Sequence, residues 1–252
     1  MNFANKENTV SVVMPSYNER ENIQEAIERI FIALGSQLRE IIVVDDDSPD
    51  KTWELVENLN NPKCRLIRRR NEKGLASALA EGVRAAKGEV VVWLDCDLGI
   101  PPEVIPRLIE RLSDSDVAIG SRYMKGGSDN RPAWRVFLSF IFNLGAGVLL
   151  GYKVRDYTSG FAAVRGDVIR KIPIRGNGFG EYFIDWAYRC VRAGVRIAEI
   201  PFSYSLRKGG VSKTDGNLMT FCVLGVKYTR HLLKTWFVTT RIYALLKVKR
   251  ED

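Results

Sequence analysis

Over its first half, the chain alternates short runs rich in Val and Ile with segments whose apolar residues recur at helical spacing. This alternation predicts an α/β fold with a mostly parallel central sheet and helices on both of its faces. The expected strands are Val10–Met14, Glu40–Val44, Arg65–Ile67, Glu89–Leu94 and Val117–Gly120. The expected helices are Glu21–Leu34, Thr52–Leu59, Gly74–Ala86 and Glu103–Leu112.

Polar side chains follow four of these strands, at the point where each strand ends. The clusters are Ser16–Glu19, Asp45–Asp47, Asp95–Asp97 and Ser121–Arg122. In a parallel sheet the carboxyl ends of the strands meet at one edge, and ligands bind there. We therefore expect the four clusters to form a single site.

Asp95 and Asp97 flank Cys96 directly after the apolar run VVVWL. Two carboxylates at this spacing can face one cation, which would neutralise charge on a leaving diphosphate. The alternative is a pair of loop acids that caps the next helix. His231 is the single histidine of the chain. A metal would therefore rely on oxygen ligands, which points to Mg or Mn.

Three neighbouring acids, Asp45 to Asp47, repel one another unless a cation or hydrogen-bond donors compensate their charge. Either they recognise a base, a ribose or a metal, or Asp47 or Ser48 caps the helix that follows. The basic run Arg68–Arg70 precedes another expected helix. For Arg68 and Arg69 we favour a solvated surface loop.

Positive charge is in excess, with 38 Lys and Arg against 30 Asp and Glu and a formal net charge of +8. This excess favours an anionic partner such as a nucleotide, a nucleic acid or an acidic membrane surface. Arg122 follows a strand end, where its guanidinium could donate to a phosphate through two N–H groups. The segment Arg207–Lys213 surrounds a glycine pair with cations. It either closes over a diphosphate or is a mobile basic surface loop.

The cysteines, Cys64, Cys96, Cys190 and Cys222, lack C-x-x-C spacing, which indicates a reducing compartment and a core position for the last two. The polar N-terminus does not resemble a signal peptide. The chain has no uninterrupted run of about 20 apolar residues, so no membrane-spanning helix is expected. Val136–Gly151 and Leu218–Leu246 come closest.

Taken together and in order, the motifs resemble those of family-2 glycosyltransferases. They are PSYNEREN from Pro15, VVDDDSPDKT from Val43, RNEKGLASA from Arg70, DCDL from Asp95 and GSRY from Gly120. Further motifs narrow the resemblance to dolichol-phosphate mannose synthases and related polyprenyl-phosphate glycosyltransferases. These are DYTSGF from Asp156, the Gly178–Glu181 region and LRKGGVSK from Leu206. The resemblance covers about residues 9–215.

The resemblance implies a GT-A (Rossmann-like) nucleotide-sugar-binding fold over residues 1–215. Residues 216–252 would form C-terminal amphipathic helices at a membrane interface or packed on the core. Asp95, Asp97 and Arg122 would be catalytic, and Asp95 and Asp97 would hold the metal. The substrate contacts that it implies are Pro15, Tyr17, Glu19, Val44 and Asp46 on the nucleotide side, Cys96 near the donor, Arg122, Arg207 and Lys213 on phosphates, and Arg135 and Ser139 on the acceptor phosphate.

Two departures from the family pattern stand out. The family has a polar residue and a His after D-x-D-L, where this chain has Gly99 and Ile100. Because of this departure, the sequence does not identify a third protein ligand for the metal. Lys51 replaces a Gly in the S-P-D-G-T motif, which we interpret as a difference in the turn.

The resemblance implies transfer of mannose from GDP-mannose to a polyprenyl (dolichyl) phosphate with inversion. The acceptor phosphate is already ionised near pH 7, so no strong general base is needed. UDP-glucose as the donor is one alternative, and a basic nucleic-acid-binding module is another. The expected partners are the nucleotide sugar, the lipid acceptor, a membrane surface and a small membrane-anchoring subunit, without nucleic acid. The expected location is the cytoplasm, peripherally attached to the cytosolic face of a membrane.

Overall fold

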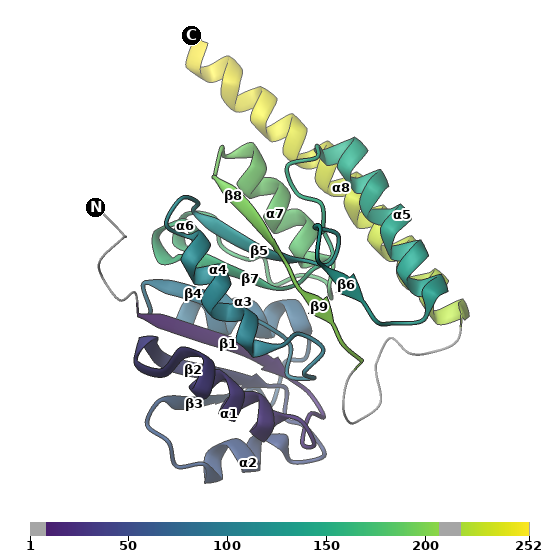
Figure 1. The fold of residues 1–252 in the computed structure, drawn as a ribbon. Coiled ribbons are helices and arrows are strands. Elements are labelled where there is room, and N and C mark those ends of the chain that lie inside the picture. Colours follow the sequence, from purple (N-terminus) through teal and green to yellow (C-terminus); the bar gives the residue numbers. More distant parts are fainter. Residues whose placement is uncertain (1–8, 207–217, 252) are drawn as a thin grey trace.

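A computed structural model describes residues 9–206 and 218–251, and in the last helix it describes the side chains of residues 223–240. Within these residues a seven-stranded sheet has the order β3-β2-β1-β4-β7-β5-β8 (Figure 1). The strands of this sheet are β1 (Val10–Ser16), β2 (Leu38–Asp45), β3 (Cys64–Arg68), β4 (Val90–Trp93), β5 (Val117–Ser121), β7 (Ala162–Arg165) and β8 (Ile197–Pro201). A small second sheet joins β6 (Ser128–Asp129) to β9 (Ser203–Tyr204).

All strand neighbours in the large sheet are parallel except those of β7, which runs antiparallel between β4 and β5. Because β7 is antiparallel to both β4 and β5, these two strands run in the same direction, as do β1 and β2. The carboxyl ends of these four strands therefore lie at the same edge. The predicted α/β fold with a mostly parallel sheet is confirmed.

Helices cover both faces of the sheet because alternate residues of each buried strand point to opposite sides. Val12 and Met14 of β1 belong to a core with α1 (Ile23–Leu34), α2 (Thr52–Asn58) and α4 (Ile105–Arg111). Val13, between them, belongs to a second core with α3 (Leu75–Ala85), α6 (Gly166–Lys171) and α7 (Tyr182–Arg192). Short 3-10 turns at Gly35–Gln37 and Pro102–Val104 complete these connections.

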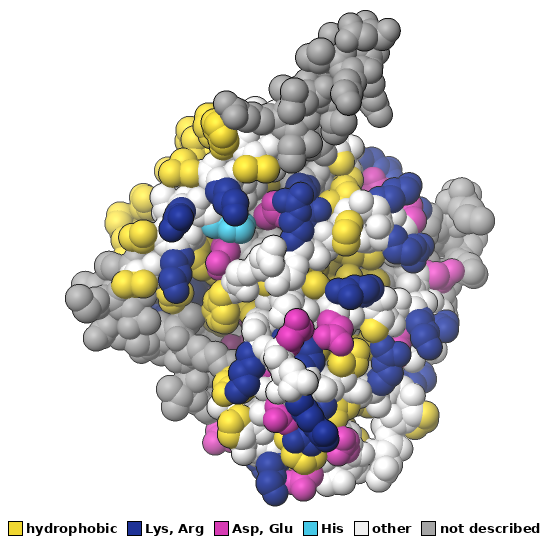
Figure 2. Space-filling model, turned by 180° about the vertical axis from the view of Figure 1, so that it is seen from behind, with side chains coloured by type: hydrophobic (Ala, Val, Ile, Leu, Met, Phe, Trp, Pro, Cys, Tyr) yellow, Lys and Arg dark blue, Asp and Glu magenta, His cyan; other side chains and the backbone are white. Residues whose placement is uncertain are grey.

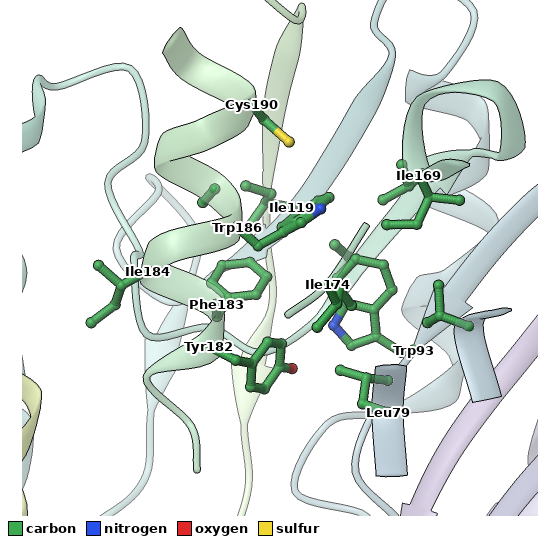
Figure 3. Close-up of a cluster of buried hydrophobic side chains, with 14 of the residues drawn as sticks. Leu79, Trp93, Ile119, Ile169, Ile174, Tyr182, Phe183, Ile184, Trp186 and Cys190 are labelled. Atoms are coloured by element: carbon green, nitrogen blue, oxygen red, sulfur yellow. The ribbon is translucent and has the colours of Figure 1, made fainter. Parts of the chain in front are cut away.

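The second core is centred on aromatic residues from β4 and α7 (Figure 3). The rings of Trp93 and Trp186 meet edge to face with their centroids 5.0 Å apart, an arrangement that aromatic quadrupoles favour. Phe183 packs on Trp186 at 5.7 Å. Because Asp95 follows Trp93 by two residues, this rigid aromatic core fixes the place where the acidic segment begins.

Two long helices, α5 (Ala133–Leu150) and α8 (Leu218–Glu251), lie side by side outside the α7 layer (Figure 1). We expected a pair of C-terminal helices, but α8 is one continuous helix. Among the described residues, α5 is long and apolar enough to cross a membrane, with a mean hydropathy of 1.6 and 28% of it buried. Length and composition alone do not separate a spanning helix from a core or interfacial one. The sequence expectation of no spanning helix therefore stays a prediction.

Candidate active site

The acidic pair stands directly beyond β4. Asp95 and Asp97 are half-buried, whereas Cys96 between them is buried and its Sγ–H donates to the Pro15 carbonyl at 3.3 Å. Asp97 Oδ1 accepts the backbone N–H of Gly99 at 2.9 Å, which holds the turn after the strand. The segment thus anchors its middle side chain on β1 while the two carboxylates flank it.

Negative charge accumulates around this segment. Burial raises the pKa of the Cys96 thiol, and the charges of Glu19, Asp95 and Asp97 raise it further. Burial also raises the pKa of Tyr204, with Asp97 and Asp95 adding to the shift. These phenol and thiol groups are therefore neutral at pH 7. A carboxylate site with neutral neighbours is well suited to a hard divalent cation.

The residues present fit such a cation through two carboxylates. Among the described residues there is no group of three or more His, Cys, Asp or Glu side chains that could hold a metal. Asp95 and Asp97 would therefore supply the ligands from the protein, and substrate phosphates and water would supply the rest, as is common for Mg²⁺. Position 99, where the family pattern has a polar residue, is a buried glycine against Tyr204.

The acid cluster after β2 is compensated by arginines and backbone donors. Asp45 is buried and accepts the backbone N–H and hydroxyl of Ser48 at 2.8 and 2.6 Å. Asp46 accepts Arg69 Nε and the backbone N–H of Gly74, both at 2.7 Å. Asp47 accepts Arg68 Nε at 2.6 Å.

These pairs correct one interpretation of the sequence. A solvated surface loop is wrong for Arg68, which is a half-buried residue at the end of β3. It is also wrong for Arg69, whose side chain is 4% exposed and lies between β2 and α3. The physical reason is that the neighbouring carboxylates Asp45 to Asp47 repel one another and need hydrogen-bond donors close by. Arg69 also donates to Ser77 Oγ at 2.9 Å and to the Gly74 carbonyl at 3.0 Å. It thereby fixes the loop beside the predicted nucleotide side of the site.

The predicted nucleotide contacts in and after β1, and Val44 in β2, differ in exposure. Glu19 is buried, and its Oε2 accepts Asn22 Nδ2 at 3.0 Å. Tyr17 is half-buried, with Lys73 Nζ 5.0 Å from its ring centroid. Pro15 and Val44 are buried strand residues, and the Val44 side chain belongs to the second core. The structure gives Val44 a packing role, and its nucleotide contact stays a prediction.

Arg122, after β5, is the centre of a buried ion-pair cluster. Its Nε and Nη2 donate to the two carboxylate oxygens of Asp156 at 2.9 and 2.8 Å, and Nη2 also donates to Thr158 Oγ1 at 2.8 Å. Asp129 Oδ2 lies 3.5 Å from Nη1. Burial opposes the charge of Arg122, but Asp156 and Asp129 raise its pKa above the ordinary value. The two N–H groups that we expected to donate to a phosphate donate to Asp156 instead.

The predicted acceptor contacts lie on α5, beside this cluster. Arg135 is buried, and Ser139 one turn later accepts a hydrogen bond from Tyr123 Oη at 2.9 Å. Asn143, a further turn along, donates to Thr158 Oγ1 at 2.9 Å. Positions spaced by four share one helix face, so α5 turns a polar stripe toward Arg122. The sequence did not suggest this link between α5 and the Arg122 cluster.

Other predicted residues fall differently. Arg207 and Lys213 lie outside the described residues. Sequence reasoning missed Asp156, Asp129 and Tyr204, although Asp156 opens a motif that carried the resemblance. Asp129 is nearly buried, and hydrogen bonds from Arg131 and the charge of Arg122 hold its pKa below the ordinary value despite burial. No spacing rule links these acids to Arg122, because Asp129 belongs to β6 and Asp156 to the segment between α5 and β7.

Comparisons with known proteins identify the family of this chain. A dolichol-phosphate mannosyltransferase of Pyrococcus furiosus is 41% identical over 89% of this chain, which spans 63% of that longer relative. An undecaprenyl-phosphate mannosyltransferase of Micrococcus luteus is 33% identical over 86% of this chain and 92% of its own length.

The fold also matches a solved structure of glucosyl-3-phosphoglycerate synthase from Mycobacterium tuberculosis, which was obtained with Mn²⁺, UDP and glucosyl-3-phosphoglycerate. The TM-score is 0.69, with 21% identity over 90% of this chain and 80% of that one. At this identity the likeness concerns the fold. The model of glycosyl transferase family 2 matches residues 11–173. The sequence prediction of the family is therefore confirmed: this chain belongs to glycosyl transferase family 2.

Proposed function

We propose that this chain transfers mannose from GDP-mannose to a polyprenyl phosphate, with inversion at the anomeric carbon. One observation supports the proposal. Asp95 and Asp97 follow β4 at the edge of the sheet where β1, β2 and β5 also end. Glu19, Asp46 and Arg122 follow those three strands at the same edge. The names of the relatives support mannose as the sugar and a polyprenyl phosphate as the acceptor. The choice of GDP-mannose as the donor rests on the sequence resemblance.

The proposed reaction is a single displacement. An oxygen of the acceptor phosphate attacks the anomeric carbon, the bond from that carbon to the diphosphate oxygen breaks, and GDP leaves with the bonding electrons. Asp95 and Asp97 would hold a divalent cation, which would supply charge neutralisation for the leaving diphosphate. The chain itself orients the two substrates, and positioning of this kind accounts for much of the rate enhancement in group transfer.

We place the acceptor end of the site beside α5, since Arg135 and Ser139 lie there next to the Arg122 cluster. The opposite face of α5 exposes large apolar side chains, among them Phe137, Phe140, Ile141, Leu144 and Val148. A lipid acceptor enters from a membrane, and an apolar helix face beside the site suits peripheral attachment there. We also propose that the chain attaches to the cytosolic face of the membrane and that a small subunit anchors it there.

The decisive experiment is turnover with short-chain polyprenyl phosphate in detergent, using GDP-mannose and UDP-glucose in parallel, each with Mg²⁺, with Mn²⁺ and with EDTA. We expect metal-dependent formation of polyprenyl-phosphate mannose and GDP. Turnover of UDP-glucose alone would replace mannose by glucose in the proposal. An absence of transfer from either donor in all metal conditions would refute it.

A further inference from the structure

A cavity of about 110 Å³ lies between α7, α8 and the segment that leads into α7. It lies outside the catalytic edge and none of the predicted site residues lines it. Its polar lining includes Arg175, Asn177, Asp185, His231, Lys234 and Thr235. Tyr182 lines it as well, and the charge of Asp95 acts on the same phenol.

The cavity has a surplus of positive charge. Asp185 is its only lining carboxylate among the described residues, and it is engaged by Arg189 Nε at 2.8 Å and by Arg175 Nη1 at 3.1 Å. Lys234 is the second cationic side chain in the lining beside Arg175, whereas Arg189 pairs with Asp185 from outside the lining. A cavity lined by two cations, whose one carboxylate is already paired, attracts an anion.

His231 is a second feature of the cavity that suits an anion. Its Nε2 is buried and finds no hydrogen-bond partner within the described part of the chain. Burial lowers the pKa of His231 and Lys234 lowers it further, whereas Glu181 and Asp185 raise it. Arg175 also lines the cavity. An unsatisfied buried nitrogen is costly, and a phosphate oxygen would satisfy it while favouring the protonated ring.

The outer surface of α8 resembles that of an interfacial helix. Lys227, Arg230 and Lys234 follow one another at helical spacing along one side. Exposed apolar side chains lie beside them, namely Val223, Val226, Leu233 and Phe237. Figure 2 shows the histidine among Lys and Arg side chains and beside acidic ones, with apolar side chains toward the adjoining margin. This combination is typical of helices that lie on anionic membranes at headgroup depth.

We propose that the cavity at His231 and Lys234 binds the phosphate group of an anionic phospholipid headgroup, at a site separate from that of the lipid acceptor. The inference rests on the proposed function only in that the enzyme works at a membrane. Lys234, Arg175 and His231 would contact the phosphate, while the apolar side of α8 contacts the acyl region. A headgroup held here would fix the depth and orientation of α8 against α7.

The single histidine makes the test direct, because one imidazole Hε1 resonance reports on the cavity. We would follow its pH titration by proton NMR in phosphatidylcholine bicelles, with and without phosphatidylglycerol, and with inorganic phosphate at the same concentration. The proposal expects phosphatidylglycerol to raise the pH midpoint, with little effect of phosphatidylcholine or inorganic phosphate. No shift with phosphatidylglycerol would overturn it. An equal shift with inorganic phosphate would also overturn it, because the cavity would then be a general anion site.

Lys234→Gln and Lys227→Gln form a matched pair, since both remove one exposed charge from the same helix and only Lys234 lines the cavity. Each variant should bind anionic vesicles roughly five-fold more weakly, because it loses the nonspecific attraction of one charge. Only Lys234→Gln should lose the headgroup-dependent shift of the His231 titration and bind phosphatidylglycerol vesicles more weakly than Lys227→Gln. Identical behaviour of the two variants would overturn the specific site.

Turnover in detergent separates this inference from the proposed function. Lys234→Gln should retain the kcat of the unmodified enzyme and its KM for a short-chain polyprenyl phosphate. A raised acceptor KM would mean that the acceptor phosphate itself occupies the cavity, which would overturn a separate site. If the enzyme transfers no sugar at all, the proposed function fails, while the NMR titration still decides the headgroup site.

Discussion

Tyr204 fills the space that a side chain at position 99 would need. A Cβ on Gly99 would lie 2.8 Å from Tyr204 Cζ and 3.1 Å from Asp97 Oδ1. The departure from the family pattern at this position is therefore matched by an aromatic ring from β9. We infer that Tyr204 and Gly99 belong to one arrangement, in which a neutral phenol stands beside the carboxylates that we propose as metal ligands.

We expect Gly99→Ala to disturb this arrangement. The added methyl group must displace Tyr204 or Asp97, and such overpacking costs about 1–3 kcal/mol. The variant should lose turnover more strongly than it loses thermal stability, because the shift falls on Asp97. Gly145→Ala, on the exposed side of α5 with nothing within 4 Å, is the control and should be stabilised by up to about 1 kcal/mol. Equal activity of the two variants would contradict the prediction.

Replacing Asp97 by Ala should abolish metal-dependent transfer. The loss should reach roughly 100-fold or more in kcat, because the metal contributes several kcal/mol of charge stabilisation to the departing diphosphate. Initial rates over a range of Mn²⁺ concentrations measure it. Asp114→Asn, an exposed acid beside Arg111, is the control and should retain activity. Full activity in the Asp97 variant would contradict the assignment of the site.

Arg122→Lys separates two roles of the arginine. A lysine cannot reproduce the two-pronged bond to Asp156, which is completely buried, so unfolding should be easier by about 3 kcal/mol or more. Urea unfolding measures the loss. Arg111→Lys, in the exposed pair with Asp114, should cost less than about 1 kcal/mol. A stable Arg122→Lys enzyme without turnover would instead favour the phosphate contact that the sequence predicted.

His231 predicts a dependence of stability on pH. Its pKa lies below the ordinary value of 6.5, so the unfolded chain binds the proton more tightly than the folded one. The free energy of unfolding should therefore fall as the pH drops below about 6.5. Urea midpoints at pH 7.5 and 5.5, for the unmodified protein and for His231→Gln, measure the effect. The variant should lose less stability over this interval, and an equal loss in both would show that other groups cause it.

The apolar face of α5 predicts membrane attachment. Phe137 and Ile141, one turn apart, are 61% and 46% exposed. Replacing both by Ser should weaken binding to phosphatidylcholine vesicles, measured by co-sedimentation, while turnover in detergent is retained. Ile32→Ser is the matched control, because Ile32 is 83% exposed on α1, away from α5 and α8. Vesicle binding that survives the double substitution would count against α5 as the attachment surface.

The sequence by itself determined the order of strands and helices in the first half, because local periodicity carries that information. It also determined the mostly parallel sheet and the edge at which the strands that precede Asp97, Asp46 and Arg122 end, since parallel strands share a direction. The motifs in order determined the family. The boundaries moved by only one or two residues in elements such as β1, which extends through Pro15 to Ser16.

Only the tertiary structure decided which charges pair. Arg69 belongs to Asp46 and Arg122 to Asp156, yet 23 and 34 residues separate these partners in the chain. The insertion of β7 between β4 and β5, the contact of Tyr204 with Gly99 and the cavity at His231 likewise join distant segments. Periodicity and spacing describe neighbours within one element, whereas these contacts depend on how separate elements pack, and no local pattern encodes that packing.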